Sequence, residues 1–319
     1  MYISIITPAP PGSRYGNRVT AVRWLKILRQ LGHRVVIRES YSNEPLDLLV
    51  ALHAKRSFDS INRFHRERPD SPIVVALTGT DLYRDLGRSE NAQRSLDIAT
   101  RIVVLQPRAA DELRDGWAKK AQVIYQSVSR SPGQKRSPQS SHFDVCVVGH
   151  LRPVKDPLRA AMAARFLPGS SRIRVTSLGG AMSARERDRA QLEMTLNPRY
   201  RWLGEVSPLR VRGILSRSRL FVISSRMEGG ANALGEAIVA GLPVLASRIS
   251  GSIGILGDDY PGYFEAGDTT ELARLMVQCE TDPEFLAEIT TRCAELIPLF
   301  DPARERASWA SLIDELEVA

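Results

Sequence analysis

A glycine-rich turn in the second half of the chain, EGGANALGEAIVAGLPVLAS at residues 228–247, carries the clearest signal for chemistry. Gly229 and Gly230 lack a Cβ, so the backbone there can approach an anion, and the first N–H groups of the following helix point toward it. Glu228 and Glu236 can both accept hydrogen bonds from the hydroxyls of one ligand. The turn therefore predicts a phosphate site. In the alternative, Glu236 only complements the helix dipole and Glu228 is solvated.

A second loop, VGHLRPVKDP at residues 148–157, combines two cations at the exit of an apolar run. Arg152 and Lys155 lie close together in a turn that Pro153 stiffens. Together they can grip a diphosphate, Arg by its forked guanidinium and Lys as a point charge. His150 lies beside a core strand, where a lone histidine is more often structural than catalytic. We therefore expect this loop and the glycine-rich turn to bind a phosphorylated ligand.

Three loops in the first half of the chain combine cations with small residues: PAPPGSRYGNR (8–18), LHAKRS (52–57) and LTGTDLY (77–83). Such a set suits a small anion, whereas a sugar calls for carboxylates, amides and aromatic side chains. Asp81 and His53 are the candidate bases in these loops. The candidate anion-binding residues are Gly12, Ser13, Arg14, Asn17, Arg18, Lys55, Arg56, Thr78, Gly79 and Thr80.

Short apolar, β-rich runs alternate with stretches of helical period, and they must position these loops. The runs occur in both halves of the chain, from YISIITP to AQVIYQ and again from FDVCVVG to PVLASR. Strands this uniformly apolar are covered on both faces, so each half is predicted to be a doubly wound α/β domain with a parallel sheet. In such sheets ligands bind beyond the carboxyl ends of the strands, where the loops lie.

The segment SVSRSPGQKRSPQSSH separates the two halves and is dense in Ser, Pro and Gly, which is typical of a linker. The prediction is a first domain at 1–128, a linker at 129–141 and a second domain at 142–298, with a tail of helices punctuated by prolines. The helix in RVTAVRWLKILRQLG is predicted to bury one apolar stripe, made of Val19, Val22, Leu25, Leu28 and Leu31.

The chain has 319 residues, 43% hydrophobic and 25% charged, which is the mix of a globular protein of about two domains. We expect a cytoplasmic protein without membrane insertion, because no apolar run approaches about 18 residues and the N-terminal residues lack a secretory signal. The three cysteines are too few for a disulfide framework or a structural zinc site. The net charge of +8 is spread along the chain without a basic block, so we expect no nucleic-acid partner.

The G-x-L-x-x-x-K-type loop at 149–155, together with Glu, seven residues and Glu at 228–236, resembles the retaining, Leloir-type glycosyltransferases of the GT-B, GT4-like class. The resemblance implies an α/β architecture of two Rossmann-like domains that face one another across a cleft. It implies that the last helix, at 303–319, packs back on the first domain. It also implies a UDP-sugar donor with no metal and no cofactor, since the D-x-D signature of the other glycosyltransferase fold is absent.

The resemblance further implies roles for single residues. Arg152 and Lys155 would neutralise the nucleotide diphosphate, Glu236 would hold the ribose, and LGEV at 203–206 would line the base. Glu228 would hold the donor sugar, which makes it a catalytic candidate beside Asp81 and His53. The implied donor-binding residues are Gly149, Arg152, Lys155, Val206, Glu228, Gly229, Gly230, Ala231, Asn232, Leu234 and Glu236.

Within this class, LHAKRS, LTGTDLYRDL and VGHLRPVKDP resemble one branch, the selenosugar synthases of selenoneine biosynthesis. That branch couples selenophosphate to UDP-N-acetylglucosamine or UDP-glucose and forms a bond between selenium and the anomeric carbon. The resemblance would explain the cations of the first half as acceptor-binding residues. Thr78 stands where members of the class often carry a histidine, and an ionised selenium nucleophile does not need a strong base.

Three other functions remain open. The chain could be a GT4-type glycosyltransferase acting on a sugar, lipid or small-metabolite acceptor, which would differ only in the acceptor loops. It could be a UDP-sugar 2-epimerase, although acid and base carboxylates are not found at clear positions. A nucleic-acid binder is favoured only by the isoelectric point. The chain is expected to be a monomer or a homodimer.

Overall fold

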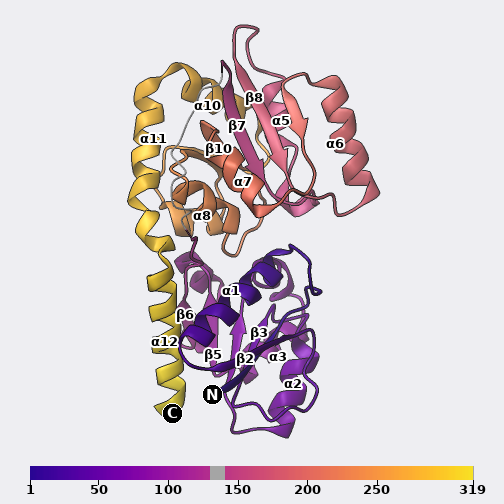
Figure 1. Cartoon of the computed structure of the whole chain (residues 1–319), viewed down its shortest axis with the longest axis vertical. Coiled ribbons are helices and arrows are strands. Elements are labelled where there is room, and N and C mark those ends of the chain that lie inside the picture. Colours follow the sequence, from indigo (N-terminus) through magenta and orange to yellow (C-terminus); the bar gives the residue numbers. More distant parts are fainter. Residues whose placement is uncertain (130–140, 319) are drawn as a thin grey trace. The chain divides into compact units, whose positions relative to one another are not determined.

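The computed structural model describes residues 1–129 and 141–318, so the linker expected at 129–141 lies outside the described residues except for its two ends. The chain divides into two compact units. The first unit comprises Met1–Ser127, Glu228–Gly230 and Asp301–Ala319, and the second comprises Val128–Met227 and Ala231–Phe300. Figure 1 shows the elements of both units.

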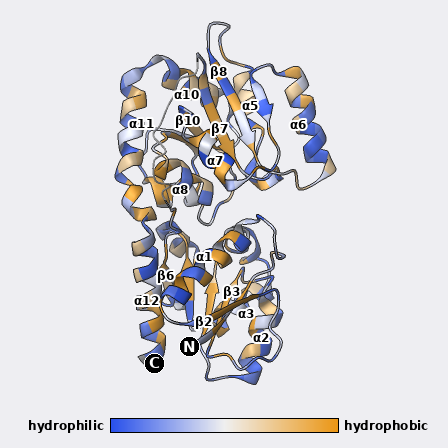
Figure 2. Cartoon of the chain, viewed as in Figure 1, coloured by the Kyte–Doolittle hydropathy of each residue, from blue (hydrophilic) through white to orange (hydrophobic). Residues whose placement is uncertain are grey.

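The first unit contains a parallel sheet of six strands in the order β2-β1-β3-β4-β5-β6. Its strands coincide with the apolar runs of the sequence, which appear in Figure 2 as hydrophobic arrows. The strand order reverses between β1 and β3, which is where such sheets bind ligands. The strands are β1 (Tyr2–Ile6), β2 (Arg34–Arg38), β3 (Leu48–Leu52), β4 (Ile73–Ala76), β5 (Arg101–Val104) and β6 (Ala121–Val123).

Both faces of this sheet are covered, as the uniformly apolar strands predict. Leu48, Val50 and Leu52 of β3 belong to one buried cluster, while Leu49 and Ala51 belong to the cluster on the opposite face. The first cluster includes residues of helices α1 and α12, and the second includes residues of α2 and α3. The helical elements of this unit are α1 (Gly16–Gln30), α2 (Phe58–Glu67), η1 (Asp81–Asp85), α3 (Glu90–Ile98), η2 (Pro107–Glu112), α4 (Asp115–Ala118) and α12 (Pro302–Val318).

Helix α1 buries a face that overlaps the predicted stripe only in part, because Leu28 is buried and Leu25 and Leu31 pack against the core as expected. Val19 and Val22 are exposed, and the buried residues are Thr20, Ala21, Trp24, Ile27 and Leu28. The reason is the contact with α12. The rings of Trp24 and Trp309 pack edge to face at a centroid distance of 4.8 Å, and Trp24 Nε1 donates to Glu305 Oε1 at 2.8 Å. A buried indole with a satisfied N–H outweighs the valines, because it removes more apolar surface from water.

The second unit contains another parallel sheet of six strands, in the order β12-β11-β10-β7-β8-β9. Here the order reverses between β7 and β10, so the loops that follow these two strands lie at the expected binding edge. The two-residue strand β12 is too short to give a sequence signal and was not predicted. The strands are β7 (Phe143–Val148), β8 (Ile173–Leu178), β9 (Tyr200–Trp202), β10 (Leu220–Ile223), β11 (Val244–Ser247) and β12 (Tyr263–Phe264).

One buried cluster joins the helices of the second unit to its sheet. The prolines of the tail act as predicted, because Pro283 starts α11 and Pro302 starts α12 of the first unit. Gly235 of α8 faces Phe300, and a Cβ built there would lie 2.8 Å from the ring. The helical elements of the second unit are η3 (Pro153–Lys155), α5 (Arg159–Ala164), α6 (Ala184–Leu196), α7 (Pro208–Leu215), α8 (Asn232–Val239), α9 (Ser250–Leu256), α10 (Thr269–Thr281), α11 (Pro283–Glu295) and η4 (Ile297–Phe300).

Membrane-spanning helices and clustered metal ligands are both missing from the described part of the chain. None of the helices within residues 1–129 and 141–318 combines the length and the apolar content that a membrane span requires. In the same ranges no three His, Cys, Asp or Glu side chains gather as a metal cluster. All three cysteines are buried and free, and burial raises the pKa of Cys146 to about 12.

Candidate functional site

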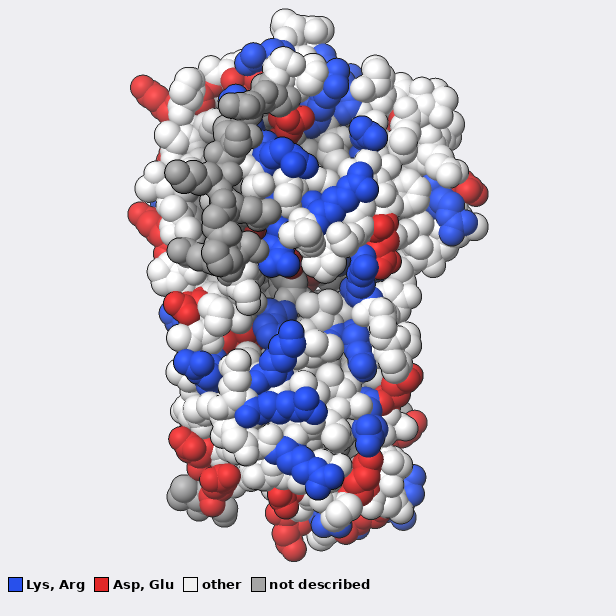
Figure 3. Space-filling view, in the orientation of Figure 1, with Lys and Arg blue, Asp and Glu red and all other residues white. Residues whose placement is uncertain are grey.

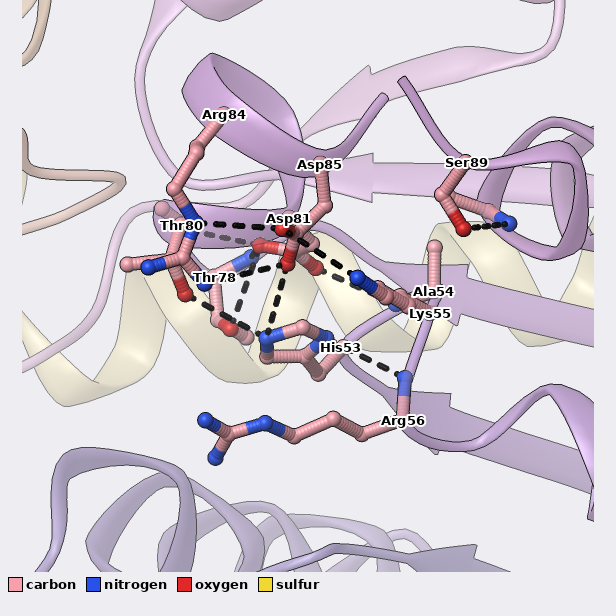
Figure 4. A network of polar contacts seen from close by, with 12 residues as sticks. His53, Ala54, Lys55, Arg56, Thr78, Thr80, Asp81, Arg84, Asp85 and Ser89 are labelled. Carbon is pink, nitrogen blue, oxygen red and sulfur yellow. Dashed lines mark hydrogen bonds and ion pairs between the residues drawn. The ribbon is translucent and has the colours of Figure 1, made fainter. Parts of the chain in front are cut away.

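The loops after β1, β3 and β4 meet at the carboxyl edge of the first sheet, because these three strands are neighbours. Asp81 ties two of them together (Figure 4). Its Oδ1 accepts from the main-chain N–H groups of Thr78 and Gly79, both at 2.9 Å, and its Oδ2 accepts from Ala54 N–H at 3.1 Å. The residue has no exposed surface. This geometry makes Asp81 a residue that positions the loops and is a poor fit to the base expected from the sequence.

His53 is the second expected base, and it is buried in a strained turn. Its φ of 75° lies in the left-handed region, and the residue is 2% exposed. Nδ1 accepts from Arg56 N–H at 3.4 Å, so the ring proton lies on Nε2, which is 3.2 Å from Thr80 Oγ1. Burial lowers the pKa of His53 below its ordinary value, although the nearby charges of Asp81 and Asp85 oppose this. His53 is therefore held neutral and fixed to Thr80.

Asp85 is a central member of this network that the sequence analysis missed. Its carboxylate lies 3.7 Å from Lys55 Nζ and 3.1 Å from Arg84 Nε, with His53 Nε2 at 3.9 Å. Burial alone would raise the pKa of Asp85, but the hydrogen bond and charge of Arg84, with Lys55 and His53, outweigh it and lower the pKa. The signal was present in TGTDLYRDL, because Asp85 follows Asp81 by one turn of η1.

The remaining acceptor-site predictions fall into two groups by exposure. Gly12, Arg14, Lys55 and Arg56 are exposed, whereas Ser13, Asn17, Arg18, Thr78 and Thr80 are half-buried. The Ser13 hydroxyl donates to Pro10 O at 2.8 Å, which closes the turn before α1. The structure joins the 53–57 and 78–81 loops through Asp81 and His53. That the 12–18 loop binds the same anion remains a prediction.

In the second unit, the loops after β7 and β8 approach closely. Gly149 N–H donates to Leu178 O at 2.8 Å, and a Cβ on Gly179 would lie 2.1 Å from Gly149 O. Gly179 also has a φ of 136°, so only glycine fits there. A Cβ on Gly149, in contrast, would meet no atom within 4 Å. His150 Nδ1 accepts from Gly180 N–H at 3.2 Å, which agrees with the structural role expected for this histidine.

Arg152 precedes the short helix η3 and Lys155 is its last residue, in the turn that the loop sequence predicts. The turn is fastened to the exit of β10, because Arg226 N–H donates to Val154 O at 2.8 Å and the Ser224 hydroxyl donates to Asp156 O at 2.8 Å. Asp156 ends η3 with a left-handed φ of 43°. Arg152 lines a pocket of the second unit, and Lys155 is not part of that lining.

The expected donor residues at 228–236 are divided between the units. Glu228, Gly229 and Gly230 belong to the first unit, and Glu228 is only 7% exposed. Ala231, Asn232, Leu234 and Glu236 belong to the second unit, where the helix predicted after the glycine-rich turn, α8, starts at Asn232. Whether Glu228 and Glu236 flank one ligand remains a prediction.

Two donor-site predictions of the second unit concern apolar side chains. Leu234 is fully buried in the apolar core, so a donor contact would have to come from its main chain, and that contact stays a prediction. Val206 is half-buried and packs on the core from the loop after β9, which leaves part of its surface available.

Basic side chains are spread over the face shown in Figure 3, and acidic side chains lie mostly toward its edges. At the carboxyl edges of the two sheets the cations are accompanied by buried or half-buried carboxylates, Asp85 in the first unit and Asp156 in the second. Each edge therefore presents fixed hydrogen-bond donors and partly neutralised cations, which together can bind a phosphate or another small anion.

Comparison with known proteins gives these two units a family. Residues 133–295, slightly more than half of the chain, match the family described as glycosyl transferases group 1. A galactosyltransferase of Escherichia coli, UDP-Gal:alpha-D-GlcNAc-diphosphoundecaprenol alpha-1,3-galactosyltransferase, is 29% identical over 160 residues. That match covers 49% of this chain and 41% of the length of the relative, so the chain matches less than half of that protein.

Two solved structures resemble the whole chain in fold. HepE of Anabaena, in complex with UDP and glucose, has a TM-score of 0.77 and 16% identity, with 99% of this chain and 100% of HepE covered. Sucrose-phosphate synthase of Thermosynechococcus elongatus has a TM-score of 0.79 and 16% identity, with 99% of each chain covered. These similarities and the two parallel sheets confirm the predicted α/β, GT-B fold class. The chain belongs to the group 1 glycosyl transferases.

Proposed function

We propose that the chain transfers a sugar, glucose or N-acetylglucosamine, from a UDP-sugar to a small anionic acceptor, for which selenophosphate is the candidate. The observation that carries the proposal is the coincidence of motif and topology. In each sheet, loops singled out by the sequence follow the two strands between which the strand order reverses, and LTGTDLY follows β4, the next strand of the first sheet. The donor assignment is further supported by HepE, which was solved with UDP and glucose, and by the Escherichia coli relative, whose name specifies UDP-Gal.

The proposed reaction proceeds in two steps. The ionised selenium of selenophosphate attacks the anomeric carbon, and the bond from that carbon to the UDP oxygen breaks with its electron pair leaving on UDP. Water then attacks phosphorus and the bond between phosphorus and selenium breaks, which releases phosphate and the selenosugar. The selenium nucleophile needs no proton acceptor. This agrees with the burial of Asp81 and with the neutral, hydrogen-bonded state of His53.

One observation favours a second acceptor class. The carboxylate of Asp85 lies among the cations of the first unit, and its lowered pKa keeps it ionised at neutral pH. A carboxylate accepts hydrogen bonds from sugar hydroxyls and repels an anion. The alternative is therefore a GT4-type glycosyltransferase with a sugar, lipid or small-metabolite acceptor bound at the same edge.

The donor assignment is tested by calorimetry with UDP and no added metal. Lys155→Ala removes a charge-assisted contact, so UDP affinity should fall about 10- to 150-fold. Lys119→Ala is the matched control, because Lys119 is exposed and lies in the first unit. Equal affinity in both variants would reject the role of Lys155 and with it the assignment of this loop.

The acceptor is tested by incubating the protein with UDP-glucose or UDP-N-acetylglucosamine, with and without selenophosphate, and measuring UDP release and product mass. Asp85→Asn separates the two acceptor classes by the sign of the change in acceptor KM. Asp70→Asn, on an exposed turn, is the control. The KM should fall for an anionic acceptor and rise for a sugar acceptor. No selenophosphate-dependent UDP release with either donor would reject selenophosphate, and interconversion of UDP-sugars without UDP release would indicate an epimerase.

A further inference from the structure

The second unit contains a pocket of about 270 Å³ formed by η3, the start of α5 and the first turns of α6. Its charged lining consists of four arginines and two acids, which leaves two positive charges in excess. The lining shares only Arg152 with the residues expected to bind the donor. The charged residues are Arg152, Asp156, Arg159, Glu186, Arg189 and Arg226.

One arginine is fixed in the wall of this pocket. Arg159 donates to Asp156 Oδ2 from Nε at 2.9 Å and to Thr269 Oγ1 from Nη1 at 2.6 Å, and its side chain is only 12% exposed. A guanidinium held in this way loses little further freedom when an anion binds. The pocket is thus preorganised on one side.

The two acids of the lining already have partners. Asp156 bridges Arg159 and Arg226, whose Nη2 lies 3.5 Å from Asp156 Oδ2. Glu186 accepts from the Ser183 hydroxyl at 2.8 Å, and the same hydroxyl caps α6 by accepting from Glu186 N–H at 3.3 Å. Arg189 has no ion pair among the residues that the structure describes and is exposed at the rim. Arg189 can therefore meet an anion in the pocket that the fixed Arg159 also lines.

We propose that this pocket binds a phosphate dianion that is separate from the nucleotide of the donor. The charge excess matches a dianion, and forked guanidinium groups suit its oxygens. The volume is below the roughly 300 to 1,000 Å³ of pockets for drug-sized ligands, so the ligand is small. The inference rests on the proposed function only for the identity of the nucleotide, and phosphate binding can be measured without it.

The experiment titrates the full chain with inorganic phosphate, followed by ³¹P NMR, first alone and then with saturating UDP. Arg189→Gln and Arg226→Gln should each weaken phosphate binding about 10-fold or more. Arg187→Gln, on an exposed position of α6 outside the lining, is the matched control. Glu186→Gln keeps the capping hydrogen bonds and removes a negative charge, so it should strengthen phosphate binding.

The outcomes separate the possible sources of the phosphate. Phosphate binding that persists at saturating UDP, weakened only in part because Arg152 is shared, supports a second site when the variants follow the expected order. Full competition between phosphate and UDP would mean that the pocket holds the phosphates of the nucleotide, and would overturn the inference. Absent phosphate binding, or equal binding in the Arg189, Arg226 and Arg187 variants, would also overturn it. Loss of UDP affinity in Lys155→Ala tests the proposed function separately.

Discussion

Replacing Asp81 by Asn distinguishes a residue that positions the acceptor loops from a catalytic base. The carboxylate accepts three main-chain N–H groups, two on Oδ1 and one on Oδ2. Asn has one acceptor oxygen. If that oxygen keeps the hydrogen bonds from Thr78 N–H and Gly79 N–H, the side-chain NH₂ of the introduced Asn faces the Ala54 N–H. Two donors then oppose one another in a site without exposed surface.

The magnitude follows from these bonds. A lost hydrogen bond to a charged group costs about 1.5–3 kcal/mol, and the two bonds that remain lose the charge that strengthened them. We expect the two loops to be destabilised by about 2–4 kcal/mol, which is an increase of about 30- to 700-fold in the population of the open state. Turnover should fall far less than this factor and far less than on loss of an essential base, because the closed loops stay the main population while the open state remains a minority.

The assay is hydrogen exchange of the Ala54, Thr78 and Gly79 amides, measured by NMR beside the turnover rate. Asp70→Asn is the control, because Asp70 is exposed on a turn of the same unit. Exchange of the three amides should accelerate in Asp81→Asn and stay unchanged in the control. Unchanged exchange together with a loss of about 10²- to 10⁴-fold in turnover would refute the reasoning, since that is the signature of a missing base.

Three further predictions concern other buried contacts. Burial lowers the pKa of His53 below its ordinary 6.5, so the unfolded chain binds a proton more readily than the folded chain, and the wild-type free energy of unfolding should be full above about pH 6.5 and fall below it. Asn tolerates the positive φ of this position, so His53→Asn should fold. In a series of denaturant titrations from about pH 7.5 to about 5.5, its free energy of unfolding should depend less on pH than that of the wild type. Gly179→Ala should destabilise the second unit by about 1–3 kcal/mol or more in thermal unfolding. Gly149→Ala should leave thermal unfolding unchanged and weaken UDP binding in calorimetry. Unchanged UDP affinity in Gly149→Ala would argue against the donor role of Gly149. Glu305→Ala leaves the buried Trp24 Nε1–H and Ser127 N–H without their acceptor. The free energy of unfolding, measured by denaturant titration and tryptophan fluorescence, should fall by about 2–5 kcal/mol. A fall below about 0.5 kcal/mol would contradict the proposal that Glu305 holds α12 to α1.

The strands were predictable from the sequence because they are apolar on both faces. A strand that is buried on both faces shows in the sequence as an uninterrupted apolar run, and β3, with the sequence LLVAL, is buried at every position. The stripe on α1 was right for Leu25, Leu28 and Leu31 and wrong for Val19 and Val22. Its buried face is set by Trp309 and Glu305 of α12, which lie far along the chain, and no local period contains that information.

The candidate site was predictable to the level of loops. Small and charged residues that follow apolar strands mark the carboxyl edge of a parallel sheet, and the structure places the segments chosen on that basis at this edge in each unit. The roles of single side chains depend on geometry that the sequence does not contain. Because of the left-handed φ of His53 and the burial of Asp81, these two expected bases are parts of a hydrogen-bonded frame that also contains Thr80. Asp85 belongs to the same frame because its carboxylate lies 3.7 Å from Lys55 Nζ.

This frame constrains the chemistry that the first unit can support. A neutral acceptor must lose a proton as it attacks, and the proton needs a base with accessible surface near the anomeric carbon. Within the frame, His53 donates its Nε2 proton to Thr80, Asp81 is fully occupied, and Asp85 is ionised with a side chain that is 7% exposed. Asp85 is thus the carboxylate that would have to accept the proton of a sugar acceptor. A selenium or other ionised nucleophile needs only the frame and its cations. Asp85→Asn should therefore lower turnover about 10²- to 10⁴-fold with a sugar acceptor, as loss of a base does, and leave turnover with an anionic acceptor largely intact.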